Sequence, residues 1–260
     1  MDLELISREP TGNRKPAPLL FVHGAWHGAW CWDEHFLPYF AQQGYAAHAV
    51  SLRGHGKSAG HVFGARVRDY VADVAQAAAG LSAPPVVIGH SMGGLVTQKY
   101  LESFTAPAAV LLASVPTAGV WRVTLKFAGR KPLAFAQANL TLSLRPLVSD
   151  PALVHEAMFS PGVPAADVDR YARQLGDESY FAFLDMLALD LPRPSRVKTP
   201  LLVLGGAGDW LFAPGEIEAT GRAYGTRAEL FPGMAHDMML EPDWRAVADR
   251  ILAWLRERGL

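Results

Sequence analysis

Cysteine, long apolar runs and an excess of one charge are all scarce in this sequence of 260 residues. The single cysteine, Cys31, excludes a framework of intrachain disulfides and any metal site built from several cysteines. No stretch of about 18 residues is continuously apolar, as a membrane-spanning helix requires. Lys and Arg number 24 against 25 Asp and Glu, with no basic run. We therefore expect neither nucleic acid nor a membrane as a partner.

The opening residues, MDLELISREP, contain acids and lack the apolar stretch of a secretory signal. Together with the single cysteine, this predicts a cytoplasmic protein. Half of the residues are hydrophobic and 19% are charged, a composition typical of a compact chain with a sizeable core. The length suits one large α/β domain, or such a domain with an insertion.

Short apolar runs alternate with longer segments of helical period along most of the chain. The runs are rich in Val, Leu and Ile without polar alternation, as in strands buried on both faces of a parallel sheet. The expected strands lie at 3–7 (an antiparallel edge), 19–24, 46–52, 84–91, 108–114, 199–206 and 228–233, and the expected helices at 66–81, 93–104, 213–225 and 243–259. The pattern predicts an α/β fold whose mostly parallel sheet is flanked by helices.

The alternation stops between residues 115 and 195, which separate two expected strands by about 80 residues. That length is too great for a loop. Helix-like pieces punctuated by Pro and Gly fill it, among them PLAFAQANLTLSL and ESYFAFLDMLAL. We interpret 115–195 as an inserted helical cap on a core formed by 1–114 and 196–260.

The stretch VVIGHSMGGLV, residues 86–96, places Ser91 between glycines at the end of an apolar run. Gly89 to Gly93 fit the G-x-S-x-G pattern, in which a serine nucleophile sits on a tight turn between a strand and a helix. A simple glycine-rich turn is the alternative interpretation of the five residues alone. The expected strand before them and helix after them favour the nucleophile.

A serine hydroxyl needs a base to take its proton and a carboxylate to orient that base. Asp209 follows one expected strand and His236 follows the last one, in the chain order serine, acid, histidine. Taken alone, Asp209 would be a helix cap and His236 an ordinary core or surface residue. Asp237 is the nearest rival carboxylate, but it is poorly placed to orient the imidazole next to it in sequence. The order and placement predict a triad of Ser91, Asp209 and His236.

Acyl transfer also needs hydrogen-bond donors for the negative oxygen of the tetrahedral intermediate. The stretch after the first core strand offers the backbone N–H of Ala25, with that of Trp26 as a weaker alternative, beside the N–H of Met92. No histidine pair has the spacing of metal ligands, and no phosphate-binding loop is complete. We expect neither a metal nor a cofactor.

These motifs resemble the landmarks of the α/β-hydrolase superfamily, in order and through nearly the whole core. They are HGAW, LRGHGKS, GHSMGG, GGAGDWLFAP and GMAHDMMLEP. The resemblance implies a serine esterase type, because haloalkane dehalogenases and epoxide hydrolases carry an aspartate in place of Ser91. The opening HGAWHGAWCW is similar to the plant methylesterase and hydroxynitrile lyase group. The lyases have a lysine after the catalytic histidine, whereas this chain has Asp237.

We predict a hydrolase that cleaves a medium-sized, apolar carboxylic ester or lactone, acting as a monomer or homodimer. Residues expected to line its pocket are Trp26, Trp30, Phe135, Met158, Phe183 and Trp210. Two alternatives use the same fold: a hydrolase of carbon–carbon bonds in ring-fission products, and a ligand-binding signalling protein. An intact triad favours an enzyme over the second.

Overall fold

The computed structural model describes residues 1–260 and contains one seven-stranded sheet, in the order β1-β3-β2-β4-β5-β6-β7. Only β1 is antiparallel to its neighbour. The strands are β1 (Leu5–Arg8), β2 (Leu19–Val22), β3 (Ala47–Val50), β4 (Val86–His90), β5 (Ala109–Leu112), β6 (Leu201–Gly206) and β7 (Ala228–Phe231). The predicted mostly parallel sheet with an antiparallel edge is confirmed.

Burial explains why the apolar runs form these strands. Every residue of β2, β3, β4, β5 and β6 is buried, as expected for central strands of a sheet covered on both faces. The prediction was wrong for β7, whose four residues are only partly buried. This strand lies at the edge of the sheet and pairs only with β6, so less of the molecule covers it.

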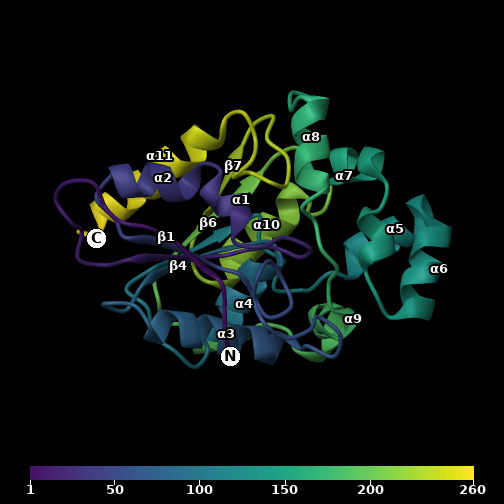
Figure 1. Cartoon of the computed structure of the whole chain (residues 1–260), viewed down its shortest axis with the longest axis horizontal. Helices are drawn as coiled ribbons and strands as arrows, with labels where there is room; N and C mark the ends of the chain where they lie inside the picture. The colour runs from purple at the N-terminus through teal and green to yellow at the C-terminus, as the bar shows by residue number, and fades with distance from the viewer.

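Helices cover both faces of the sheet (Figure 1). On one face α2 packs against α11, and on the other α3 packs against α4. Tyr224, just after α10, donates to Gln98 of α4 (2.9 Å), which places α10 on the face of α4. The core helices are α1 (Trp30–Asp33), α2 (Phe36–Gln42), α3 (Val67–Ala79), α4 (Met92–Tyr100), α10 (Pro214–Ala223) and α11 (Trp244–Glu257).

Residues 115–195, between β5 and β6, contain no strand and form what we call the helical segment. Its helices gather to one side of the sheet, where α5 and α6 are the outermost elements in Figure 1. They are α5 (Trp121–Arg130), α6 (Pro132–Thr141), α7 (Pro151–Met158), α8 (Ala165–Ala172) and α9 (Tyr180–Leu184), which continues as a π-helical turn over Asp185–Leu189. Helix α5 was not among the helical pieces noted in the sequence. None of the helices combines the length and the apolar character needed to cross a bilayer.

The direction in which successive strands are added to the sheet reverses between β2 and β4. From β2 the chain continues to β3 on one side, whereas β4, β5, β6 and β7 follow on the other. Loops at the carboxyl ends of strands on either side of such a reversal diverge and leave a crevice. Ala25 follows β2 and Ser91 follows β4, so both residues lie at this crevice.

Candidate active site

Ser91 stands on a strained turn between β4 and α4. Its φ of 52° and ψ of −118° lie outside the backbone regions that non-glycine residues favour. Such backbone strain clusters at active sites and ligand-binding sites. Two neighbours must be glycine for the turn to pack. A Cβ on Gly89 would lie 2.3 Å from Gly93 O, and one on Gly93 would lie 2.4 Å from His23 O. The glycines around the hydroxyl therefore let α4 lie directly against β4 and the end of β2.

Asp209 and His236 form a buried, hydrogen-bonded pair. His236 Nδ1 donates to Asp209 Oδ2 over 2.8 Å, and the exposed fractions are 2% and 8%. The other carboxylate oxygen of Asp209 accepts the backbone N–H groups of Leu211 (2.7 Å) and Phe212 (3.1 Å). These bonds fix the carboxylate, so it holds the imidazole with Nε2 as the free nitrogen.

The surroundings of His236 raise its pKa above the ordinary value. Burial by itself lowers that pKa, but the negative charge of Asp209, its hydrogen bond and the charge of Asp237 outweigh the burial. Ser91 and His236 line the same small cavity, although Ser91 Oγ makes no hydrogen bond within the chain. In ligand-free enzymes the bond between nucleophile and base is often long and tightens with substrate bound.

Two backbone N–H groups next to Ser91 have no acceptor in the protein, those of Ala25 and Met92. Met92 is the first residue of α4, where helix amides are unpaired and the helix dipole favours negative charge. Gly24 O accepts from His23 Nδ1 (2.8 Å) and His27 N (3.3 Å). Because a trans peptide directs its N–H opposite to its carbonyl, these bonds turn the Ala25 N–H away from both histidines.

The weaker candidate for this role, the N–H of Trp26, is already engaged. It donates to Glu178 Oε2 over 3.4 Å. Ala25, like Ser91, lines two cavities: the small one shared with His236, and an apolar pocket between the core and the helical segment. The geometry therefore favours Ala25 and Met92 as the pair of donors.

A second cluster of titratable groups lies behind His236. Asp237 Oδ2 accepts from His27 Nε2 (3.1 Å), and His90 Nε2 donates to His236 O (3.0 Å). Burial and the neighbouring His236 lower the pKa of His90 to about 3, so His90 is neutral. Burial favours protonation of Asp237, but the charge and hydrogen bond of His27 outweigh it and lower its pKa. Asp237 is thus the hydrogen-bond partner of His27, and Asp209 is the hydrogen-bond partner of His236.

One trio in this cluster has the spacing of a metal site. His90, His236 and Asp237 each present one ligand atom, all within 4.8 Å of one another. All three make other hydrogen bonds, since His236 donates to Asp209, His90 donates to a carbonyl and Asp237 accepts from His27. A cation held by the remaining nitrogen of His236 would compete with proton transfer from Ser91, so the arrangement suits a base better than a ligand.

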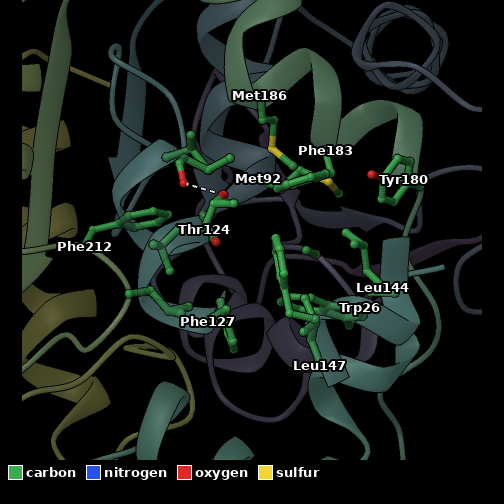
Figure 2. Close-up of a pocket in the computed structure, with 18 of the residues that line it drawn as sticks. Trp26, Met92, Thr124, Phe127, Leu144, Leu147, Tyr180, Phe183, Met186 and Phe212 are labelled. Atoms are coloured by element: carbon green, nitrogen blue, oxygen red, sulfur yellow. Dashed lines mark hydrogen bonds between the residues drawn. The ribbon is translucent and has the colours of Figure 1, made fainter. Parts of the chain in front are cut away.

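Ser91 is among the residues that line an apolar pocket between the core and the helical segment. Figure 2 shows this pocket. Sixteen of its nineteen lining residues are hydrophobic and none is charged. Thr124 donates to Val120 O (2.8 Å), the dashed line in Figure 2, and Asn139 accepts from Tyr180 (2.6 Å). The Ser91 hydroxyl and the buried indole N–H of Trp26 are thus the polar lining groups without a partner in the protein.

The structure distributes the six side chains expected in the pocket over different places. Trp26, Phe135 and Phe183 line it, and Met158 lines the small cavity beside Ser91 and His236. Trp30 lies outside, because it stacks between His27 and Tyr171 at centroid distances of 5.5 and 6.1 Å. Trp210 also lies outside, because its ring packs on Phe127 and under Lys126.

Several of the lining residues were not predicted from the sequence. Helix α5 supplies Val123, Thr124 and Phe127, and Figure 2 shows Thr124 and Phe127 together on the side of the pocket nearest Phe212. A signal for this helix exists, since Val123 and Phe127 are four residues apart and both are buried. The other unanticipated lining residues are Val115, Val120, Ala138, Asn139, Leu144, Leu147, Tyr180, Leu211 and Phe212.

A family model for the alpha/beta hydrolase family matches residues 19–250, which is most of the chain. The protein belongs to the alpha/beta hydrolase family. Its fold is the fold of that family, as the motifs predicted. The similarity of HGAWHGAWCW to the plant methylesterase and hydroxynitrile lyase group is not confirmed by the relatives found.

Curated relatives carry two kinds of name. A monoacylglycerol lipase from Mycolicibacterium smegmatis is 24% identical in an alignment of length 250, and the alignment covers 85% of this chain and 81% of the lipase. A non-heme haloperoxidase from Rhodococcus erythropolis is 37% identical over 103 residues, which cover 38% of this chain and 37% of that protein. The haloperoxidase match therefore spans less than half of either protein.

Solved structures share the whole fold at low identity. A monoacylglycerol lipase from Paleococcus ferrophilus superposes with a TM-score of 0.76 at 21% identity, covering 99% of this chain and 100% of the lipase. An esterase from Exiguobacterium antarcticum gives 0.78 at 16% identity, covering 98% of this chain and 95% of the esterase. At these identities the likeness establishes the fold alone.

Proposed function

We propose that this protein hydrolyses carboxylic esters through an acyl-enzyme on Ser91. The observation that carries the proposal is the buried hydrogen bond between His236 Nδ1 and Asp209, beside a serine on a strained turn. In this mechanism His236 Nε2 takes the Ser91 proton as the hydroxyl attacks the ester carbonyl. Asp209 holds the ring and stabilises the imidazolium that forms. The N–H groups of Ala25 and Met92 stabilise the oxyanion.

His236 then acts as an acid and a base in turn. It gives the proton to the departing alcohol oxygen, which leaves the acyl group on Ser91. A water molecule next loses a proton to His236 and attacks the acyl carbonyl, and the proton returns to Ser91 as the acid departs. No cofactor enters these steps.

The substrate we propose is an uncharged ester with a medium-sized apolar group, covered by the helical segment as a cap. The pocket supports this, because it has no charged lining residue and the side chains of Thr124, Asn139 and Tyr180 are bonded to each other or to the backbone. A charged ester would lose its hydration there without compensation. The same reasoning disfavours a ring-fission product, which carries a carboxylate. The lipase and esterase names among the relatives agree with an ester.

Release of p-nitrophenol from acetate, butyrate and octanoate esters tests the proposal. We expect repeated turnover by the native protein, with butyrate or octanoate preferred over acetate. Ser91→Ala and His236→Ala should each lower kcat by at least about 10⁴-fold. His155→Ala removes a half-buried imidazole of α7 outside the site and should leave turnover unchanged. A native protein that releases one equivalent and stops, or that prefers a charged ester, would contradict the proposal.

A further inference from the structure

A buried carboxylate of the helical segment contacts the loop that contains Ala25. Glu178 lies between α8 and α9 and is 1% exposed. Its Oε1 accepts from Tyr70 Oη (2.7 Å) and Ser179 N (2.6 Å), and its Oε2 accepts from His55 Nε2 (3.0 Å) and Trp26 N (3.4 Å). Three of these four donors belong to the core. The bonds thus join the helical segment to α3 and to the loops after β2 and β3.

The partner His55 makes this carboxylate part of a buried ion pair. His55 Nδ1 lies 3.1 Å from Arg53 O and its Nε2 faces Glu178, so both ring nitrogens act as donors. Burial lowers the pKa of His55, but the charge and hydrogen bond of Glu178 outweigh it and raise that pKa. A charged pair with this many donors has one favourable arrangement in a dry interior, so Glu178 is fixed in position.

The same part of the helical segment holds Trp26 from both sides of its backbone. Trp26 has a φ of 65°, a left-handed conformation that is costly for a bulky residue. Its N–H donates to Glu178, and its carbonyl accepts from Gly176 N over 2.7 Å. The Trp26 N–H shares its peptide unit with the carbonyl of Ala25, and that carbonyl accepts from His27 Nδ1 over 2.8 Å. Without Glu178, only His27 would hold the Ala25–Trp26 peptide.

We propose that Glu178 is a positioning residue for the oxyanion hole: by binding the Trp26 N–H, it holds the loop so that the Ala25 N–H faces the oxygen developing at Ser91. This inference rests on the proposed function and assigns the helical segment a part in the chemistry as well as in the pocket. The hole is complete only while residues 176–178 are seated on the core. Displacement of residues 176–178 from the core lowers the rate of acylation without removing any group that contacts substrate.

Glu178→Gln tests the inference because it keeps the shape of the side chain, removes its charge and replaces one acceptor oxygen by a donating NH₂ group, so the four donors can no longer all be accepted. Asp185→Asn is the matched control. Asp185 is a carboxylate of the helical segment with the same 1% exposure, and it also binds the core, through Arg66 and the N–H of Val67 (3.0 Å). It makes no hydrogen bond to residues 24–27. A general loosening of the segment affects both variants, whereas loss of the hole affects Glu178→Gln alone.

Two rates are measured for each variant: ester turnover, and the modification of Ser91 by a fluorophosphonate. In the second reaction Ser91 Oγ displaces fluoride from phosphorus, and the negative phosphoryl oxygen uses the same donors. We expect Glu178→Gln to lower kcat about 10- to 100-fold with KM little changed, and to slow the modification by a similar factor. Asp185→Asn should change both rates less than about threefold.

Equal losses in the two variants, or native rates in Glu178→Gln, would overturn the inference. If Glu178→Gln does not fold, as its thermal transition will reveal, Tyr70→Phe removes one donor and leaves the charge. It should lower kcat by a smaller factor, again at constant KM, and native kinetics in it would overturn the inference. A native protein that is modified at Ser91 but hydrolyses no ester refutes the proposed function alone, since the modification rates still judge Glu178.

Discussion

Helices α4 and α6 both contribute to the pocket, but they are built in opposite ways. Eight of the nine residues of α4 are buried, whereas α6 buries only Ala138 among ten residues. Leu133 and Leu140 of α6 are 86% and 85% exposed. A helix that positions reacting groups is held from every side, because misplacement by about 1 Å can cost about 100-fold in rate. A helix that only lines the pocket has no such requirement.

The comparison teaches where change is tolerated in this protein. The strained backbone of Ser91 persists because α4 is locked against β2 and β4 by contacts that leave no room for a Cβ. The outer face of α6 has no such neighbours. Substitutions of the α6 residues that line the pocket should alter substrate preference at a small cost in stability, while substitutions around Ser91 should abolish activity or the fold.

Asp209→Asn should produce the largest effect on the rigid side of the comparison. The asparagine can present its NH₂ group to His236 and favour the wrong tautomer, as in other triads, with a loss in kcat of about 10⁴-fold. Ester turnover and a circular dichroism spectrum measure the effect at an unchanged fold. Asp237→Asn removes the neighbouring carboxylate, and an equal or larger loss there would mean that the wrong acid has been assigned.

Gly93→Ala and Gly129→Ala compare the two regions with the same chemical change. A Cβ on Gly93 would lie 2.4 Å from the carbonyl oxygens of Val22 and His23, while nothing lies within 4 Å of one on Gly129 in α5. We expect Gly93→Ala to lower the free energy of unfolding by at least about 3 kcal/mol. Gly129→Ala should raise it by about 0.5–1 kcal/mol, because alanine is the better helix former. Urea titrations of both variants measure the difference. Similar values would show that α4 is less constrained than its packing indicates.

Phe127→Ala and Leu125→Ala sharpen the comparison within one helix. Phe127 lines the pocket and is 6% exposed, whereas Leu125, two residues earlier in α5, is 65% exposed. Removal of the Phe127 ring should lower kcat/KM for butyrate about tenfold and shift the preference toward longer acyl groups. Leu125→Ala should leave the chain-length profile unchanged. An unaltered profile in Phe127→Ala would place the acyl group outside this pocket.

The pH dependence should give the smallest effect. His236 must be neutral to accept the Ser91 proton, so kcat/KM should fall as the pH decreases through the pKa of His236, which lies above the ordinary value of 6.5. In Asp209→Asn the charge that raises this pKa is absent and burial continues to lower it. The acidic limb of the residual activity should therefore move to lower pH. An acidic limb at the same pH in both proteins would mean that the titration of another group causes it.

Prediction from the sequence succeeded where chemistry and backbone geometry act over short distances. The elbow around Ser91 is specified by local glycines, and the buried strands by unbroken apolar runs. Strand β7 was predicted too buried, because the runs do not reveal which strand lies at the edge. The roles of Trp30 and Trp210 depend on which rings pack against them, and that information is spread over distant segments.

The sequence by itself determined the seven strands along the chain, the family, and Ser91, Asp209 and His236 as candidates, since these follow from periodicity and from motifs of a few residues. Only the tertiary structure decided that Asp209 and His236 hydrogen-bond, that Asp237 serves His27, and that Glu178 binds the Trp26 N–H. Those contacts join residues 27, 210 and 152 positions apart. Such pairings are set by the packing of the whole chain, because no local pattern records which buried donor meets which acceptor.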